Sequence, residues 1–528
     1  MTVARTLSMS LRGLEGTVVE VETEVSAGLP AFTIVGLPDS STLQARERVR
    51  GACAHSGHSV ASKRLTVNLT PAWIPKQGSN FDVAIAMSAL ASLGVMDPRA
   101  LSRVLFLGEL TLDGELRPVP GVLPSLLAAA RAGIDRAVVP VGNAEEAALV
   151  PGIQVSAIAH LADAVRDFGG EASASVTVPS FEPSASPPGD PQGGPVRVGE
   201  ADADGSAFRG GVDFAEIHGQ ERGTLAAQVA AAGGHHLLLL GPPGTGKTMI
   251  ASRLPTIMPE LDDARALELS AIASVAGVFD ARAGLVRTPP FVAPHHSATP
   301  ASIIGGGAGI AGPGAVSRAH GGVLFLDEAP EFSPRVLEAL REPLETGDIA
   351  LHRARGVTVY PARFQLVLAA NPCPCGRAHG RGDACTCTAQ QKRRYLTRLS
   401  GPILDRIDLR VRLGPARPAA RRAGTTGLDS AHIRARVIEA RGRQAVRLHG
   451  TPWRLNAHVS GRFLSEHMPL DGRDEAILTR ALERGALTMR GRDRVRRLAW
   501  SVADLAGRDR PTSDDLATAL DLRGHDAL

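Results

Sequence analysis

Hydrophobic and polar positions follow three different patterns along this chain. In the first part, short apolar runs typical of strands are interleaved with longer segments whose apolar residues recur at helical spacing. From 213 to 413, strand and helix patterns alternate, which predicts a parallel sheet wrapped by helices. The last part is almost entirely helical in pattern, as at Ile477, Leu478 and Ala481. In the first part we expect strands at 16–25, 65–69, 104–107 and 137–140 and helices at 42–55, 81–93 and 123–132.

Two polar segments divide these patterns. Residues 169–212 are rich in Gly, Pro, Ser and Asp and poor in large apolar residues, as expected of a flexible linker, and 414–430 form a second polar break. The sequence therefore predicts a multidomain α/β protein, with an α+β domain at 1–168, a parallel α/β domain at 213–413 and a helical domain at 431–528.

Composition is that of a soluble globular protein, with 528 residues and a net charge of +4. This charge is too small to indicate nucleic acid by itself. No segment has the layout of a signal peptide or of a membrane-spanning helix, so we expect a cytoplasmic protein that does not bind membranes. Arginine supplies most of the positive charge, and the only lysines are Lys63, Lys76, Lys247 and Lys392.

Lys247 lies in a phosphate-binding motif. The stretch GPPGTGKT fits the P-loop pattern directly after the apolar run 237–240. Its glycines let backbone N–H groups wrap phosphates, its lysine neutralises the β and γ phosphates, and its threonine hydroxyl ligates Mg²⁺. The expected nucleotide-binding residues are Gly241, Pro242, Pro243, Gly244, Thr245, Gly246, Lys247 and Thr248.

Polar side chains end two further apolar strands. Asp327 and Glu328 follow the run 323–326, and we expect Asp327 to hold Mg²⁺ and Glu328 to polarise the attacking water. Asn371 follows the run 365–370, where its amide orients the water and senses the γ phosphate. A turn-forming asparagine before a proline is the alternative interpretation of Asn371.

These motifs occur in an order that resembles a known family. The pieces GPPGTGKT, APHH, IIGGG, GGVLFLDEAPEF, ANPCPCG and SGPILDRID are similar to the AAA+ ATPases related to the magnesium-chelatase motor subunit, specifically the YifB/ComM family. The amino-terminal pieces GLPAFTIVGLPDSS, TVNLTPAWIPKQGS and GELTLDGELRPVPG extend this resemblance over nearly the whole chain. The resemblance implies an AAA+ P-loop core with a parallel sheet and a carboxy-terminal helical lid.

The resemblance also implies a ring, usually a hexamer, that binds ATP and Mg²⁺ between neighbouring subunits. Arg406 in GPILDRID matches the arginine finger that reaches the γ phosphate of the neighbouring site. Arg490 matches the second sensor arginine of the lid, and Arg494 follows one helical turn later. In a chain so rich in arginine, solvated surface residues are the alternative.

Two segments are candidates for contact with a substrate in the ring. One is the Gly-rich segment 301–320, and the other is 347–364, which reads as a β-hairpin carrying His352, Arg353 and Arg355. Related ring helicases grip the nucleic-acid backbone with hairpins in similar places. Cations at a hairpin tip suit sequence-independent phosphate contacts, although a solvated turn is the alternative.

A cysteine cluster lies in NPCPCGRAHGRGDACTC. Two thiol pairs on one loop suit a tetrahedral structural Zn²⁺ site, but the spacing within each pair is tighter than usual, so free thiols remain the alternative. A second candidate metal site, the pair His295 and His296 in the APHH motif, is poorer, because adjacent side chains point in different directions. The candidate zinc ligands are Cys373, Cys375, Cys385 and Cys387.

The amino-terminal domain resembles the proteolytic domain of Lon peptidases, with the fold of ribosomal protein S5 domain 2. That activity needs a serine nucleophile and a lysine base. The resemblance places Asn80 or its neighbour Ser79 at the nucleophile and Leu123 at the lysine, and 115–131 contain no lysine. We therefore expect this domain to lack the catalytic dyad and to stabilise the ring or guide substrate.

Three functions follow, in decreasing order of support. The first is an ATP-driven motor that moves along branched or single-stranded DNA and, by resemblance, promotes branch migration in the recombination of incoming DNA. The second is a motor that remodels a protein partner, as the chelatase motor subunit does. The third is an ATP-dependent protease, which the missing dyad disfavours. The residues alone support ATP hydrolysis coupled to motion.

Overall fold

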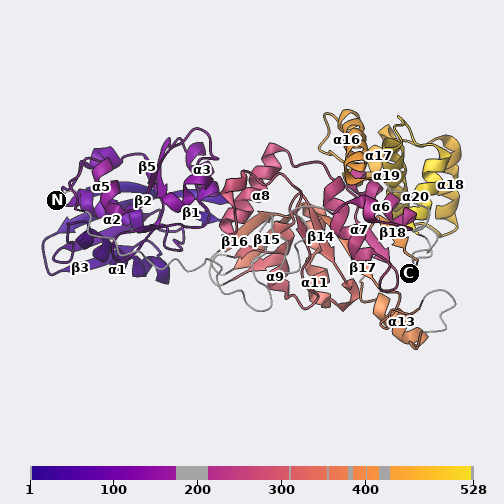
Figure 1. The fold of residues 1–528 in the computed structure, drawn as a ribbon, viewed down its shortest axis with the longest axis horizontal. Helices are drawn as coiled ribbons and strands as arrows, with labels where there is room; N and C mark the ends of the chain where they lie inside the picture. Colours follow the sequence, from indigo (N-terminus) through magenta and orange to yellow (C-terminus); the bar gives the residue numbers. More distant parts are fainter. Residues whose placement is uncertain are drawn as a thin grey trace.

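The structure is a computed structural model that describes residues 3–173, 212–307, 311–353, 356–378, 385–399, 401–414 and 428–524. Three parts follow one another along its long axis, in the order of the sequence (Figure 1). Arg355 and most of the two polar segments at 169–212 and 414–430 lie outside the described residues.

The amino-terminal part is built on a mixed sheet of seven strands in the order β3-β4-β2-β1-β5-β8-β9. β1 and β2 are long antiparallel partners joined by a tight turn, and β5, β8 and β9 add to β1 as parallel strands. The strands are β1 (Val3–Arg12), β2 (Glu15–Ser26), β3 (Ala31–Val35), β4 (Arg64–Thr70), β5 (Val104–Phe106), β8 (Arg136–Pro140) and β9 (Gln154–Ile158).

Helices cover both faces of this sheet: Phe106 of β5 packs in one buried cluster with Ile85, and its neighbour Leu105 packs in another with Leu123. The central one, α2 (Asp82–Ser92), has the sequence DVAIAMSALAS and is buried along its whole length. Its alanine and serine side chains are small, so the helix lies close to β1 and β2. Because all of its sides are buried, it carries no polar face. The others are α1 (Ser40–His55), α3 (Val122–Arg131), α4 (Ala144–Ala147) and α5 (Leu161–Asp167).

The sequence pattern predicted four of the seven strands of this sheet and three of the five helices that cover it. β1, β3 and β9 were not expected, although apolar and polar residues alternate over 7–12 in β1, which is itself the pattern of a half-buried strand. β1 is the largest omission, since it joins the antiparallel and parallel halves of the sheet.

The central part contains the predicted parallel sheet, in the strand order β11-β14-β17-β10-β18. All of its neighbouring strands are parallel. β10 (Leu237–Leu240), β14 (Val323–Leu326) and β17 (Gln365–Ala370) are completely buried, which explains why they read as uninterrupted apolar runs. β11 (Phe291–Val292) and β18 (Leu409–Arg412) form the two edges.

The remaining elements of the central part surround the sheet or extend from it. The hairpin β15–β16 pairs Arg353 with Gly356 at its tip, which confirms the predicted hairpin. The helices are α6 (Glu221–Gly233), α7 (Lys247–Arg253), α8 (Asp263–Val275), α9 (Pro300–Ile304), α10 (Ala315–Arg318), α11 (Pro334–Ala339), α12 (Arg341–Thr346), α13 (Ala389–Leu396) and α14 (Gly401–Leu404). The additional strands are β12 (Gly305–Gly306), β13 (Gly312–Pro313), β15 (Asp348–Arg353) and β16 (Gly356–Pro361).

The amino-terminal part packs on the central part through a buried polar contact. Glu146 is 8% exposed and accepts hydrogen bonds from the Ser274 hydroxyl of α8 and from the backbone N–H of Leu123. The backbone N–H of Gly121 donates to the Ser274 carbonyl at 3.1 Å. Because a buried carboxylate needs such donors, this contact fixes how α3 sits on α8.

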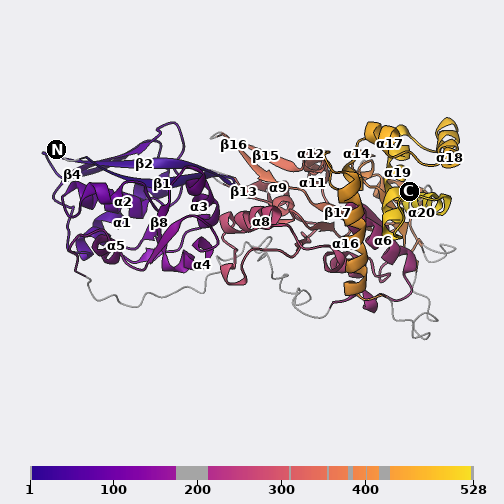
Figure 2. The ribbon, with the colours of Figure 1, turned by 90° about the horizontal axis from the view of Figure 1, so that it is seen from above.

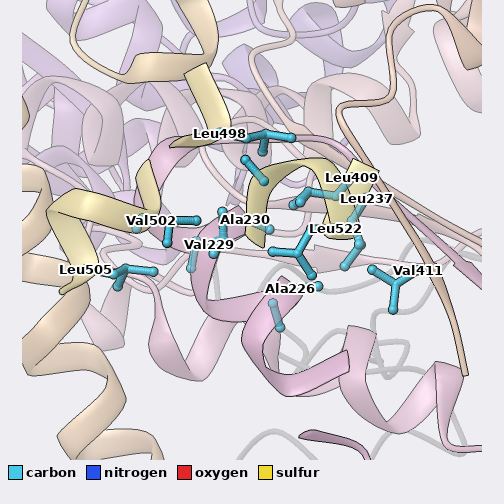
Figure 3. Packing of buried hydrophobic residues seen from close by; sticks show 14 of the residues in the cluster. Ala226, Val229, Ala230, Leu237, Leu409, Val411, Leu498, Val502, Leu505 and Leu522 are labelled. Atoms are coloured by element: carbon cyan, nitrogen blue, oxygen red, sulfur yellow. The ribbon is translucent and has the colours of Figure 1, made fainter. Parts of the chain in front are cut away.

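The carboxy-terminal part is helical, as predicted, and packs mainly on α6 and on the edge strand β18. Figure 3 shows Leu498 and Val502 of α19 near Ala230 of α6, in the same buried cluster as Leu237 of β10. Each such fully buried aliphatic side chain contributes roughly 1.5–3 kcal/mol. The helices are α16 (Ser430–Arg447), α17 (Gly461–His467), α18 (Gly472–Glu483), α19 (Met489–Leu505) and α20 (Ser513–Arg523).

A buried carboxylate, Asp408, joins the sheet to these helices. Asp408 accepts from the ring of His235 at 3.1 Å and pairs with Arg494 of α19 at 3.3 Å. The other ring nitrogen of His235 contacts the Ser501 hydroxyl at 2.7 Å. Burial alone would raise the pKa of Asp408, but the hydrogen bond from His235 and the charge of Arg494 lower it below its usual value.

We expect Asp408→Asn to destabilise the protein by about 3 kcal/mol, because it leaves the buried Arg494 without its counter-charge. The midpoint of urea denaturation measures this loss. The lowered pKa also predicts that the carboxylate stabilises the fold above about pH 4 and that this contribution disappears as the pH falls further.

The matched control is Asp521→Asn. Asp521 pairs with Arg222 at the surface, where the side chains are 60% and 42% exposed, so we expect a change below about 1 kcal/mol. Equal effects of the two substitutions would show that Asp408 does not join the sheet to the helices.

Candidate nucleotide-binding site

The predicted P-loop lies between β10 and α7. Gly244 and Gly246 have φ angles of +77° and +85°, which a glycine adopts without strain. The loop turns the chain from the buried strand into the amino terminus of α7, where a helix binds anions well.

Lys247 points back into this loop. Its ammonium donates to the carbonyls of Gly241 at 2.7 Å and Pro242 at 3.0 Å and to the side-chain oxygen of Asn371 at 3.1 Å. Burial lowers the pKa of Lys247, and the nearby charges of Asp327 and Glu328 oppose this shift. The structure thus brings together the P-loop lysine and the asparagine at the end of β17, two residues that lie 124 positions apart.

Thr248 and Asp327 form a second pair across the sheet. The Thr248 hydroxyl donates to the Asp327 carboxylate at 2.7 Å. A hydroxyl and a carboxylate side by side are the oxygen ligands that Mg²⁺ prefers, so the described residues fit the predicted magnesium site.

Glu328 occupies a strained backbone position directly after Asp327. Its φ is +50°, a left-handed conformation that is rare for residues other than glycine and costs about 1–3 kcal/mol. Its backbone N–H donates to the Asp327 carboxylate at 2.9 Å, and its side chain is 52% exposed. The Glu328 carboxylate is thus half exposed next to Asp327, and its charge acts on Lys247.

His296 lies beside Glu328, which sequence analysis did not predict. Its Nδ1 atom is 3.7 Å from a carboxylate oxygen of Glu328, and its ring packs on His295 with 4.0 Å between centroids. The APHH motif marked His296 in the sequence, but nothing in the motif indicated that Glu328 lies next to it in space.

Arg406 lies in a different group of side chains. It pairs with Glu345 at the end of α12, and it donates to the Pro402 carbonyl at 2.6 Å. Burial and the nearby charges of Arg341 and Arg490 lower its pKa. Several arginines are therefore crowded together here, which suits the binding of an anion.

Arg490 belongs to the same group. Its guanidinium is 3.8 Å from the Asp405 carboxylate, and Asp405 directly precedes Arg406 in the chain. The Arg490 side chain is 79% exposed. The two predicted transition-state arginines thus lie together, with carboxylate partners that differ from those of Lys247 and Thr248.

The predicted nucleic-acid contacts lie at the end of the hairpin β15–β16. His352 and Arg353 are exposed there, while Arg355 lies outside the described residues. Figure 2 shows this hairpin extending toward the amino-terminal part. A Cβ atom at Gly13, in the β1–β2 turn, would lie 2.6 Å from the Val359 carbonyl, so the turn packs directly on the hairpin.

The four clustered cysteines converge in space. Their sulfur atoms lie within 4.8 Å of one another, with pairs at 3.4, 3.7 and 3.7 Å. A tetrahedral site with Zn–S bonds of about 2.3 Å separates its sulfurs by about 3.8 Å, so these thiols fit a metal ion. The N–H of Arg377 and the neighbouring thiols lower the pKa of Cys375 to about 6.

The residues at the Lon-like dyad positions make other contacts. Ser79 donates to Glu109, Asn80 donates to the Met9 carbonyl at 2.7 Å, and Leu123 is fully buried. Lys76 is also buried, and its ammonium donates to a backbone carbonyl. These contacts are structural ones and do not form a serine–lysine pair.

Comparison with known families identifies the three parts. The family described as magnesium chelatase, subunit ChlI, matches residues 213–420, its amino-terminal model matches 21–143, and its carboxy-terminal model matches 427–523. Protein YifB of Escherichia coli is 38% identical over 98% of this chain and 96% of its own length, and competence protein ComM of Haemophilus influenzae is 37% identical over 99% and 98%. The chain belongs to the YifB/ComM family of magnesium-chelatase-like proteins.

Two further relatives extend this assignment. An uncharacterised protein of Mycobacterium tuberculosis is 46% identical to this family member over 99% of both chains. Lon protease 2 of Bacillus subtilis is 34% identical over a shorter stretch, 27% of this chain and 26% of its own length. Among the residues that the structure describes, no helix is long and apolar enough to cross a bilayer.

We expect Lys247→Ala to abolish nucleotide binding, because no other ammonium lies in the loop motif to neutralise the phosphates. Glu328→Gln should leave binding within about twofold and slow hydrolysis by roughly 10²–10⁴-fold, since an amide is a poor base. Fluorescent nucleotide titration and phosphate release measure the two effects. Normal hydrolysis by Glu328→Gln would show that another group acts as the base.

Proposed function

We propose that this protein is a ring-forming ATPase whose nucleotide sites are shared between neighbouring subunits. One observation carries the proposal: Lys247 contacts Asn371 and Thr248 contacts Asp327, whereas Arg406 bonds to a separate carboxylate, Glu345. A γ phosphate held at Lys247 therefore needs a cation from another copy of the chain to complete its surroundings.

In this mechanism the phosphates of ATP lie in the loop 241–246, with Lys247 on the β and γ phosphates. Thr248 and Asp327 hold Mg²⁺, which neutralises phosphate charge. Glu328, half exposed directly after Asp327, polarises the attacking water. Asn371 exchanges its contact with Lys247 for one with the γ phosphate, so it senses whether that phosphate is present.

Arg406 and Arg490 of the neighbouring subunit supply positive charge to the transition state. The crowding of arginines around Arg406 favours transfer of its guanidinium from Glu345 to an incoming phosphate, because an anion with more than one charge offsets their repulsion better than one carboxylate does. We infer a hexameric ring from the family, with each subunit giving a P-loop to one neighbour and arginines to the other.

We further propose that the ring moves along DNA. The exposed His352 and Arg353, with Arg355, place cations at the end of a hairpin whose backbone position is fixed by the β1–β2 turn. Such contacts bind phosphates without reading sequence. The relative named competence protein ComM supports a role in the recombination of incoming DNA, and we propose branch migration as that role.

A protein partner is the alternative substrate. The three matching family models are named for a subunit of magnesium chelatase, a multi-subunit enzyme in which the corresponding motor acts on other proteins. An ATPase that responds to a protein but not to DNA would favour this function.

We also propose that Cys373, Cys375, Cys385 and Cys387 hold a structural Zn²⁺. The spacing of their sulfur atoms supports this assignment, and so do their backbone donors: the N–H of Arg377 points to Cys375 and that of Ala378 to Cys373. Such donors stabilise the thiolate form that zinc requires.

Mixing two inactive variants tests the shared site. Arg406→Ala and Lys247→Ala should each lose ATPase activity, the first by roughly 10³-fold or more. In rings assembled from equal amounts of both, about a quarter of the interfaces combine an intact P-loop with an intact arginine. We therefore expect activity to return to about that fraction of the wild-type rate.

The control for this mixing is Arg462→Ala, which removes a surface arginine of α17 that is 85% exposed. It should keep full activity, and rings mixed equally with Lys247→Ala should show about half of the wild-type rate, which is the share of intact P-loops. Failure of the mixed rings to regain activity, or a wild-type rate independent of dilution, would contradict a shared site.

The DNA contact is tested by Arg353→Ala combined with Arg355→Ala. We expect affinity for forked DNA to fall by about 10–100-fold and the salt dependence of binding to become shallower, because phosphate contacts are lost. Nucleotide affinity should not change. Fluorescence anisotropy of labelled forked DNA at several salt concentrations measures the DNA affinity and its salt dependence.

The matched control is the pair Arg462→Ala and Arg484→Ala, which removes two exposed arginines from the helical part. Equal losses in both double variants would mean that net charge alone binds DNA. Wild-type protein that binds no DNA, with an ATPase that a protein partner stimulates, would support the alternative function.

A further inference from the structure

The cysteine cluster lies directly against the nucleotide site. It begins two residues after Asn371, with only Pro372 between Asn371 and Cys373. Proline restricts the backbone, so the position of Cys373 largely determines that of Asn371. Asn371 is the residue whose side-chain oxygen accepts a hydrogen bond from Lys247 at 3.1 Å.

The first cysteine pair forms a tight turn that packs on the P-loop. The backbone N–H of Gly376 donates to the Cys373 carbonyl at 2.9 Å, and Gly376 has a φ of +71°. A Cβ atom at this position would lie 2.7 Å from Cδ and 2.8 Å from Cγ of Pro243. Only a glycine fits here, because its backbone touches the proline ring of the phosphate-binding loop.

The second cysteine pair leads the chain back to the same place. After Cys387, Thr388 caps α13 with a capping box, and this helix carries the buried Tyr395. The backbone N–H of Asn371 donates to the Tyr395 hydroxyl. The described residues on the two sides of 379–384 therefore meet twice, at the Asn371–Tyr395 hydrogen bond and at the four sulfurs.

We propose that a metal ion bound by these four cysteines positions Asn371 and Pro243, so that nucleotide affinity and hydrolysis depend on whether the metal is bound. The inference rests on the proposed ATPase function and adds a second role to the proposed Zn²⁺. Without a metal, Cys375 and Cys385 must be held together across ten positions of chain by thiols alone, which costs loop-closure entropy. The Asn371 amide and the Pro243 ring then lose their support.

The metal does not contact the nucleotide in this proposal. Cys373 and Gly376 transmit its effect, the first along the backbone to Asn371 and the second by packing on Pro243. These residues are positioning residues, and the reacting groups are those already described. The dependence should therefore appear in nucleotide affinity, which is measured without turnover, as well as in the rate.

The test compares three variants of the full-length protein, purified under reducing conditions with zinc supplied. Cys385→Ser with Cys387→Ser should lose the single equivalent of zinc, bind a fluorescent ATP analogue about fivefold or more weakly, and hydrolyse ATP at least about tenfold more slowly. Cys53→Ala is the control, since Cys53 is buried in the amino-terminal part. It should keep both metal content and affinity.

Gly376→Ala separates metal binding from positioning. All four thiols remain, so we expect a full equivalent of zinc, but the added methyl group pushes on Pro243 and should weaken nucleotide binding about tenfold. This variant keeps the proposal testable if the double serine variant does not fold, which circular dichroism shows.

Three results would overturn the inference: wild-type protein that takes up no metal, a metal-free double serine variant with affinity within twofold of wild type, or Gly376→Ala with unchanged affinity. Each of these would leave the shared ATPase site intact. Wild-type protein that binds nucleotide in a metal-dependent way but never hydrolyses it would instead contradict the proposed function and retain the inference.

Discussion

The carboxylate of Asp408 lies where the P-loop strand, the segment with Arg406 and the helical part meet. His235 lies two residues before β10, Asp408 lies two residues after Arg406, and Arg494 follows Arg490 by one helical turn. Asp408 is 5% exposed, so its charge must be matched by these partners. The same contacts that stabilise the fold therefore set the positions of the phosphate-binding loop and of both predicted transition-state arginines.

This connection links two separate groups of side chains within one chain. The groups around Lys247 lie at the ends of the central strands β10, β14 and β17, where parallel strands bring distant residues together. Arg406 and Arg490 lie around the segment before the edge strand β18, with Glu345 and Asp405 as partners. In the proposed ring, both groups are attached to the same sheet, so a change at the nucleotide of one subunit would move the arginines that it presents to the next.

Two parts outside the sheet act on this core from different sides. In the amino-terminal part, the residues at the Lon-like dyad positions make structural contacts: Ser79 bonds to Glu109, and Leu123 fills the core. The buried Glu146 of this part holds α8, and its β1–β2 turn packs on the hairpin that carries Arg353. On another side, the cysteine cluster packs on Pro243 through Gly376. The fold thus supports both the proposed substrate contact and the nucleotide loop from outside the catalytic sheet.

The sequence by itself determined the sheet, the P-loop and the strand ends with Asp327, Glu328 and Asn371. A buried parallel strand must be apolar throughout, and the chemistry of triphosphate requires particular side chains at fixed spacing from it. The long strand β1 was missed, and its place between β2 and β5 is decided by pairing with neighbours along the sheet. The tertiary structure alone decided the pairing of Arg406 with Glu345, the approach of His296 to Glu328, the burial of Asp408 and the contact of Gly376 with Pro243. Each of these joins segments distant in sequence, and their meeting depends on the packing of the whole chain, which no local spacing encodes.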